Sequence, residues 1–394
     1  MIDPASLARI RAETPGIGRG VHLMACGASL MPAPVVDEVI RFTRLEAEIG
    51  GYEAAEAEAG ALEAVYDKIA AHIGAKPHEI AIVENATVAW CQAFYALPMA
   101  PGSRILTAEA EYAANYLAFL QRARRDGVKI DVVPSDATGA LDTSALEAMI
   151  GPDVALIAVT WVPTNGGLVN PAAQIGRIAR RHGVPYLLDA CQAAGQMPID
   201  VGEIGCDFLS ATGRKFLRGP RGTGFLYVRD EWLGRLEPVM VDLFSAHWVA
   251  RDAYELRSDA RRFETWENAY ALRAGLGAAF DYMDAIGIEA IEARVTALAR
   301  LMRERLAAIP RATVRDLGRR PCGIVSFDLA RLDADAVVAA MRADGFVLGT
   351  STPASTRIDA ERRHLPTLVR LAPHYYNTED EIAACADALA RIAA

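Results

Sequence analysis

The sequence predicts an α/β fold built on a mostly parallel β-sheet with helices on both faces. Short apolar runs alternate with segments of helical period from about residue 79 to residue 210, and polar residues follow several of the runs. Repeated strand, helix, strand units are typical of such sheets, because each parallel return needs a crossover. The chain has 394 residues, 52% of them hydrophobic, so we expect two domains. They are a large domain over 15–255 and a smaller α+β domain over 256–394, which the N-terminal segment 1–14 joins.

Each element follows from the spacing of apolar residues. Helical spacing predicts helices at 32–49 and 61–73. Strands are then expected at 79–83, 104–107, 129–133, 154–160, 185–189 and 206–210, with helices at 113–125, 143–150 and 171–182. After about residue 255 the pattern changes to helices at 269–286, 288–309 and 380–392 with shorter pieces between them. Ligands of parallel sheets bind beyond the carboxyl ends of the strands, so residues following the strands are the functional candidates.

Composition narrows the class of function. A net charge of −9 and the lack of long Lys or Arg runs argue against nucleic acid and anionic membranes as partners. The first residues lack a basic region followed by an apolar run, and apolar stretches such as 154–162 are too short to span a membrane. Six cysteines show neither C-x-x-C nor Cys/His ligand spacing. We expect a soluble cytoplasmic protein with a small-molecule substrate and no metal.

Lys215 is the most informative single residue. Only four of the 41 basic residues are lysines, and this one lies between a predicted strand and the glycine-rich turn 219–224. An amine can lose its proton and attack a carbonyl, whereas guanidinium cannot, so Lys215 is predicted to anchor a cofactor covalently. An ordinary surface lysine is the alternative. The turn lacks the P-loop lysine and precedes a strand, which indicates a backbone turn rather than a nucleotide loop.

Asp189 ends the apolar strand 184–189. A carboxylate buried there needs a cationic partner, and the protonated ring nitrogen of pyridoxal phosphate meets that need. A helix N-cap is the alternative. Gln192 follows three residues later and either contacts the ring hydroxyl or is solvated. Asn85-Ala86-Thr87-Val88 follows a strand and opens a helix, which is a natural phosphate cradle, although any helix start can carry threonine.

Taken together, these residues resemble the class V aminotransferase and cysteine desulfurase-like family of fold type I pyridoxal phosphate enzymes, over almost the whole chain. The resemblance implies that pyridoxal 5′-phosphate binds covalently to Lys215, within the large domain 15–255. It further implies a homodimer with the active site at the interface. The remaining contacts that it implies are to Ala86, Thr87, Thr212 and Arg214 for the phosphate, Asp189 and Gln192 for the ring, Tyr112 stacked on the ring, and Arg370 for the substrate carboxylate.

Several positions depart from the family pattern. Arg214 replaces the histidine that usually precedes the lysine, and the segment 262–267 replaces a Gly-Thr pair that reaches the partner's phosphate. Desulfurases carry a nucleophilic cysteine on the loop that matches 349–357, and this loop has none; the nearest earlier cysteine is Cys322. The Glu111-Tyr112 pair is more similar to isopenicillin N epimerase-like members, and the chain overall to these and to sulfoxide lyase-like members.

The resemblance implies chemistry at the α carbon of an amino-acid substrate. We expect a lyase that catalyses β-elimination, similar to C–S lyases, because persulfide formation needs the missing thiol. An aminotransferase, an epimerase and a catalytically silent cofactor-binding protein are the alternatives. Tyr112 either supplies a proton on the opposite face or only stacks on the ring.

Overall fold

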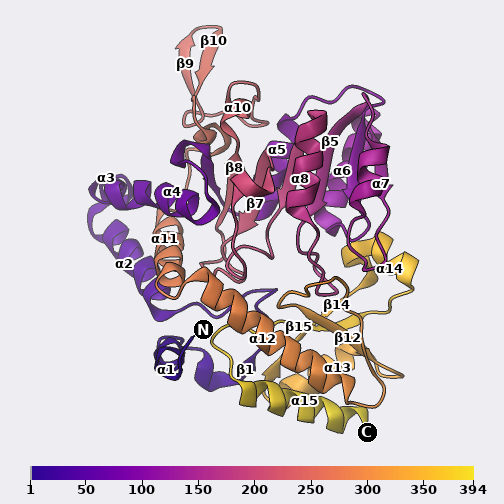
Figure 1. Cartoon of the computed structure of the whole chain (residues 1–394). Helices are drawn as coiled ribbons and strands as arrows, with labels where there is room; N and C mark the ends of the chain where they lie inside the picture. Colours follow the sequence, from indigo (N-terminus) through magenta and orange to yellow (C-terminus); the bar gives the residue numbers. More distant parts are fainter. Residues whose placement is uncertain (1) are drawn as a thin grey trace.

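The structure is a computed structural model that describes residues 2–394. Residue 1 of the predicted segment 1–14 therefore lies outside the described residues. The central feature is a seven-stranded sheet in the order β2-β8-β7-β6-β5-β3-β4 (Figure 1). Strand β8 is antiparallel to β2 and β7, and all other neighbours are parallel, which confirms the predicted mostly parallel α/β fold. The strands are β2 (Ile80–Val83), β3 (Arg104–Ala108), β4 (Lys129–Val133), β5 (Val154–Thr160), β6 (Tyr186–Asp189), β7 (Phe208–Thr212) and β8 (Gly224–Val228).

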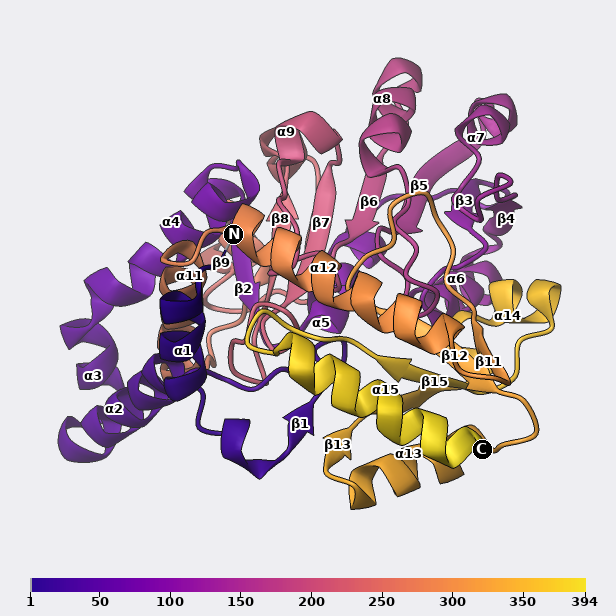
Figure 2. The ribbon, with the colours of Figure 1, turned by 60° about the horizontal axis from the view of Figure 1, so that its bottom comes forward.

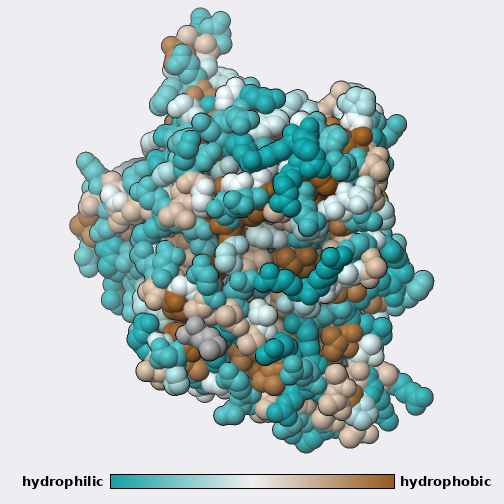
Figure 3. Space-filling view, viewed as in Figure 1, coloured by the Kyte–Doolittle hydropathy of each residue, from teal (hydrophilic) through white to brown (hydrophobic). Residues whose placement is uncertain are grey.

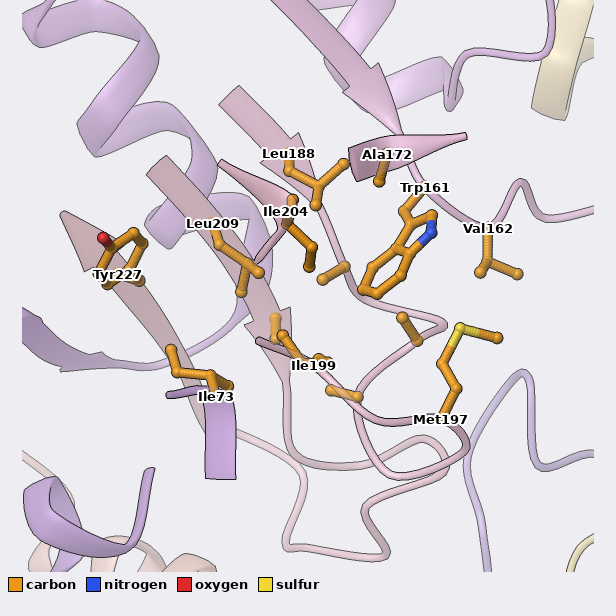
Figure 4. Packing of buried hydrophobic residues seen from close by; sticks show 14 of the residues in the cluster. Ile73, Trp161, Val162, Ala172, Leu188, Met197, Ile199, Ile204, Leu209 and Tyr227 are labelled. Carbon is orange, nitrogen blue, oxygen red and sulfur yellow. The ribbon is translucent and has the colours of Figure 1, made fainter. Parts of the chain in front are cut away.

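Helices connect these strands and cover both faces of the sheet. They are α5 (Ala86–Ala96), α6 (Ala113–Asp126), α7 (Thr143–Met149), α8 (Ala172–His182) and α9 (Val201–Ile204), and the short α10 (Asp230–Leu233) follows β8. Successive strand residues point to opposite faces, so Leu187 packs in one core while Leu188 packs in the other. Figure 4 shows Leu188 and Leu209, from neighbouring strands, in the second of these cores with Trp161.

The strand predicted at 206–210 lies instead at Phe208–Thr212, and the reason is local. Helix α9 ends at Ile204, and the left-handed backbone of its capping residue Gly205 turns the chain. Asp207 then accepts hydrogen bonds from the Tyr186 amide at 2.8 Å and from the Arg229 guanidinium at 3.0 Å. The side chain of Asp207 thus holds the chain where the strand begins, and the strand ends two residues nearer to Lys215 than predicted.

The C-terminal part contains a second sheet with its own core. Its antiparallel strands lie in the order β11 (Ala312–Val314), β12 (Val325–Leu329), β15 (Leu368–Leu371) and β14 (Gly349–Ser351). Helices α12 (Ile288–Ala307), α13 (Ala334–Ala343) and α15 (Glu379–Ala393) pack against it, and α12 and α15 lie side by side (Figure 2).

Several segments link the two parts. Strand β1 (Val21–His22) pairs in parallel with β13 (Phe346–Val347). Helix α11 (Tyr270–Asp284) packs on α2 (Ala33–Ile49) and α4 (Ala59–Ile73), and α1 (Pro4–Ala12), α3 (Gly51–Ala57) and α14 (Arg357–Arg363) complete the set of helices. The division of the chain into 15–255 and 256–394 stays a prediction.

A hairpin that the sequence pattern did not indicate stands out from the molecule (Figures 1 and 3). It consists of β9 (Ala246–Ala250) and β10 (Ala253–Leu256), paired antiparallel. Most of its residues are exposed, including Trp248, and Leu243 just before it is exposed as well. No helix among residues 2–394 combines the length and the apolar character that crossing a membrane requires.

Candidate active site

A cavity of about 600 Å3 lies where β6 and β7 end and α5 begins. This is the carboxyl edge of the parallel strands, where ligands of such sheets bind. The structure brings most of the predicted site residues together in its lining. The lining residues are Glu84, Asn85, Ala86, Thr87, Val88, Tyr112, Asn115, Asp189, Cys191, Thr212, Arg214, Lys215, Arg221 and Gly222.

Lys215 lies in the tight turn that follows β7. The turn is closed by hydrogen bonds from the Arg218 amide to the Lys215 carbonyl at 3.0 Å and from the Gly219 amide to the Gly213 carbonyl at 2.8 Å. Burial lowers the pKa of the Lys215 amine, and the charges of Arg214 and Arg370 lower it further, while Cys191 and Asp189 oppose the shift. A lowered pKa increases the fraction of neutral amine, which is the form that attacks a carbonyl.

Asp189 ends β6 and lies in the cavity wall, only 5% exposed. Its Oδ2 accepts a hydrogen bond from Asn115 Nδ2 at 3.0 Å, and its Oδ1 accepts one from the Cys191 amide at 2.9 Å. The buried ion pairs of residues 2–394 join other groups, such as Glu264 with Arg273, and Asp189 takes part in none. A buried carboxylate of this kind needs a cation, and the protonated ring nitrogen of pyridoxal phosphate fits that requirement.

The first turn of α5 also lines the cavity. The Asn85 side chain caps the helix by accepting from the Val88 amide at 3.0 Å. The amides of Ala86 and Thr87 precede the first intrahelical hydrogen bond and remain available to an anion at the positive end of the helix dipole. Strand β8 approaches closely here, since a Cβ on Gly224 would lie 2.7 Å from the Asn85 carbonyl carbon. This end of the cavity fits a phosphate group.

Two cationic side chains line the cavity near this turn. Burial lowers the pKa of Arg214, and the neighbouring charge of Arg221 lowers it further, as expected of two guanidinium groups that share one site. Arg214 also donates to the Gly27 carbonyl. Thr212 lines the same wall and donates its hydroxyl to the Thr223 carbonyl at 3.3 Å. The contacts of Thr212 and Arg214 with a phosphate stay predictions, and the charge of both arginines favours an anion.

Tyr112 and Gln192 are placed differently. Tyr112 caps α6, lines the cavity and is 40% exposed, so its ring is free to cover a flat ligand. Gln192 is buried outside the set of lining residues. Its amide nitrogen donates to the Cys26 carbonyl at 3.2 Å, and its amide oxygen has no hydrogen-bond partner among the described residues. Contact between Gln192 and the ring hydroxyl stays a prediction.

Arg370 lies on β15, whose neighbours are β12 and β14. Its guanidinium donates to the Thr164 carbonyl at 3.0 Å and to the Thr164 hydroxyl. Arg370 is outside the cavity lining, yet its charge lowers the pKa of both Lys215 and Arg214. The Arg370 Nε atom is buried without a hydrogen-bond partner in the described part of the chain. A free donor on a guanidinium near Lys215 suits the binding of a carboxylate.

Sequence reasoning did not assign roles to Asn115, Cys191, Glu84 or Arg221, which also line the cavity. The spacing in the sequence could have indicated Asn115, because it follows Tyr112 by about one helical turn and therefore lies on the same side of α6. Cys191 lay two residues after Asp189 in the same strand-end loop, and Arg221 lay in the turn after Lys215.

The cysteines near the site are poorly suited to nucleophilic work. The segment 349–357 is ordered as β14, the turn Pro353–Thr356 and the start of α14, and it carries no thiol. Cys322 is 4% exposed, and burial raises the pKa of its thiol to about 12. Burial also raises the pKa of Cys191, with Asp189 adding to the shift. A thiolate is the reactive form, so these groups are largely unreactive near neutral pH.

Comparison with known proteins places this cavity in a family. The sequence model described as Aminotransferase class-V matches residues 21–385. The chain is 29% identical to a probable cysteine desulfurase of Methanothermobacter thermautotrophicus, covering 98% of this chain and 97% of the relative. It is 30% identical to a cysteine desulfurase of Serratia proteamaculans, covering 98% and 97%.

Solved structures agree with this placement. The apo cysteine desulfurase of Thermococcus onnurineus NA1 superimposes with a TM-score of 0.92 at 25% identity, covering 98% of each chain. The cysteine desulfurase CsdA of Escherichia coli has the same fold, with a TM-score of 0.91 at 24% identity and 98% coverage of each chain. The likeness to epimerase-like and sulfoxide lyase-like members stays a prediction. The chain belongs to the aminotransferase class-V family and is a pyridoxal phosphate-dependent enzyme.

Proposed function

We propose that this enzyme is an amino-acid lyase that removes a substituent from the β carbon, with C–S bonds as the favoured target. The observation that carries the proposal is the absence of a thiol in segment 349–357, together with the burial of Cys322. Relatives named cysteine desulfurases act on cysteine, which supports a sulfur-containing amino acid as substrate. Without a reactive thiol to accept sulfur, release of the substituent by elimination is the remaining route to the same bond cleavage.

Each site residue has a role in this proposal. Bound pyridoxal phosphate supplies an electron sink conjugated to the substrate α carbon. Lys215 would hold the cofactor, and its Nζ would accept the α proton of the substrate. The Arg370 guanidinium binds the substrate carboxylate through parallel hydrogen bonds, which orients the α carbon toward Lys215.

The groups around the cofactor keep it in place and in the reactive protonation state. The carboxylate of Asp189 would hold the proton on the ring nitrogen, and Gln192 would contact the ring hydroxyl. The amides of Ala86 and Thr87, with Thr212 and Arg214, bind the phosphate. Tyr112 stacks on the exposed ring face and excludes water from it.

We also propose a homodimer whose sites lie at the subunit interface, and a cytoplasmic location. The exposed apolar side chains of Leu243 and Trp248 support the first. All six cysteines are free thiols in the structure, which supports the reducing compartment.

Product analysis tests the proposed reaction. Purified enzyme incubated with S-substituted cysteines is expected to release pyruvate and ammonia in equal amounts, because the unsaturated product of elimination hydrolyses to both. A keto acid that keeps the substrate side chain, without ammonia, would show an aminotransferase instead, and an inverted amino acid would show an epimerase. Lys215→Ala is the matched control: it should lose both the activity and the borohydride-reducible cofactor adduct. An adduct on Lys68, Lys76 or Lys129 in the wild type would overturn the assignment of Lys215.

A further inference from the structure

A second buried carboxyl group lies behind the candidate site, where β3, β5 and β6 end side by side. Glu111 is 3% exposed and lies in the turn between β3 and α6. Its neighbour Thr160 ends β5 and is paired in register with Asp189 on β6. Glu111, like Asp189, forms no ion pair in the part of the chain that the structure describes. Two carboxyl groups are therefore buried together, and neither forms an ion pair with a side chain of the described residues.

Asn115 joins the two carboxyl groups. Its Nδ2 donates to Asp189 Oδ2 at 3.0 Å and to Glu111 Oε1 at 2.8 Å. An amide NH2 has two hydrogens, so each carboxyl group receives one. Turning the amide over would place its oxygen against both carboxyl groups, which is unfavourable. Glu111 thereby determines that Asn115 presents a donor, and not an acceptor, to Asp189.

Glu111 itself accepts hydrogen bonds from β3, from β5 and from the start of α6. Oε2 accepts from the Thr107 hydroxyl at 3.1 Å and from the Thr160 amide at 2.9 Å. Oε1 accepts from the Tyr112 amide at 3.1 Å, from Asn115 and from the Thr160 hydroxyl. An environment made only of donors suits an ionised carboxylate, which can only accept.

Burial works against that ionisation. It raises the pKa of Glu111 to about 7, with Asp189 adding to the shift and the hydrogen bonds from Thr160 and Asn115 opposing it. Two titratable groups on β6, Asp189 and Tyr186, interact with Glu111 electrostatically. A cation bound against Asp189 would favour the ionised form of Glu111, because opposite charges stabilise each other at short range in a buried site.

We propose that Glu111 is a positioning residue: acting through Asn115, it orients the Asp189 carboxylate toward the cofactor's ring nitrogen and adds a second negative charge behind it. The inference rests on the proposed function, since it requires Asp189 to face that nitrogen. Glu111 does not touch the cofactor, so its effect is on the preference of the site for a protonated ring nitrogen.

The preference of the site for a protonated ring nitrogen is measured by comparing how tightly two probes bind to the apoprotein. The probes are pyridoxal 5′-phosphate and its deaza analogue, which carries carbon in place of the ring nitrogen. The ratio of their dissociation constants is measured by equilibrium dialysis above neutral pH. Glu111→Gln is expected to reduce the preference for the natural cofactor by roughly tenfold, the effect of one pKa unit at that nitrogen. Glu109→Gln is the matched control, because its carboxylate contacts Arg362 and Ser135, and it should keep the wild-type ratio.

The outcomes separate the inference from the proposed function. A wild-type ratio in Glu111→Gln with a reduced ratio in Asp189→Asn would overturn the role of Glu111 alone. A wild-type ratio in Asp189→Asn would instead remove Asp189 from the ring nitrogen and the proposed function with it. Circular dichroism shows whether Glu111→Gln folds. If it does not, Asn115→Leu is used instead, because leucine is similar in size to asparagine and cannot form the hydrogen bonds that join Glu111 to Asp189. It should show the same reduction, and an unchanged ratio there would also overturn the inference.

Discussion

At the scale of single residues, the proposed function predicts that the charge of Asp189 controls the chemistry of the site. Asp189→Asn is expected to fold and to bind cofactor but to lose turnover by at least about 10²-fold, the usual scale for removing a preorganised charged group. A neutral amide cannot hold a proton on the ring nitrogen. Steady-state kinetics with the best S-substituted cysteine, beside the absorption spectrum of the bound cofactor, give the measurement. Near-normal turnover would place the stabilising charge elsewhere.

Glu111 gives the apoprotein a measurable dependence on pH. Its pKa is raised from an ordinary 4.5 to about 7, so the folded chain holds a proton that the unfolded chain has released. The free energy of unfolding therefore falls as pH rises from about 4.5 to about 7, and this contribution is constant outside that window. Glu111→Gln lacks this slope.

Chemical denaturation of both apoproteins across pH measures the effect as a difference. Wild-type stability minus variant stability is expected to decline across the window. His72, whose pKa burial lowers to about 4, contributes a slope of opposite sign to both proteins and cancels in the difference. Parallel stability curves would show that Glu111 titrates normally.

At this scale, a site residue could be predicted from the sequence only where it differs from its immediate neighbours in the chain. The placement of Lys215 and Asp189 in the cavity was predictable, because each residue is unusual beside its neighbours. Lys215 is a rare lysine in a turn, and Asp189 is a carboxylate at the end of an apolar strand. Their roles stay predictions. The contacts of Glu111 with Asn115 and Thr160 were not predictable, because they form only where the ends of β3, β5 and β6 meet. Hydrogen bonds between residues 49 positions apart, as from Thr160 to Glu111, leave no pattern along the chain.

At the scale of elements, β8 contacts the start of α5, which is the part of the cavity that we propose to bind phosphate. Gly224→Ala would place a methyl group 2.7 Å from the Asn85 carbonyl carbon and 2.8 Å from the Ala211 carbonyl oxygen. We expect weaker cofactor binding and a loss of stability above about 1 kcal/mol, typical of overpacking. Gly234→Ala is the control, since no atom lies within 4 Å of its added Cβ.

Calorimetry and cofactor titration check this prediction. Equal cofactor affinity in the two alanine variants would show that the turn at Asn85 moves freely and does not define the phosphate site. The alternation of strands and helices was predictable from apolar spacing alone, as the confirmed sheet shows. The shift of β7 to Phe208–Thr212 was not, because it depends on the contact of Asp207 with Tyr186 and Arg229.

At the scale of the whole molecule, the projecting hairpin β9–β10 forms a separate two-stranded sheet, and most of its residues are exposed. A two-stranded hairpin is marginal in water, and this one projects from the molecule (Figure 3). Trp248 on β9 is 76% exposed, and Leu243 just before the hairpin is 71% exposed. We expect a dimer in sedimentation, and the double variant Leu243→Glu, Trp248→Glu should shift it toward monomer. Leu332→Glu, in the turn between β12 and α13, is the control and should remain dimeric. A wild-type monomer with full activity would contradict the proposed interface.

The central claim is that a carbon–sulfur bond is cleaved by elimination, with no sulfur passing to the protein. Mass spectrometry of the intact enzyme after incubation with cysteine tests it most directly, together with analysis of the carbon product. We expect an unmodified protein mass and pyruvate as the product, because segment 349–357 has no thiol and burial raises the pKa of Cys322 to about 12. A sulfur adduct on Cys322 or any other cysteine, with alanine as the product, would make this protein a desulfurase and contradict the lyase proposal.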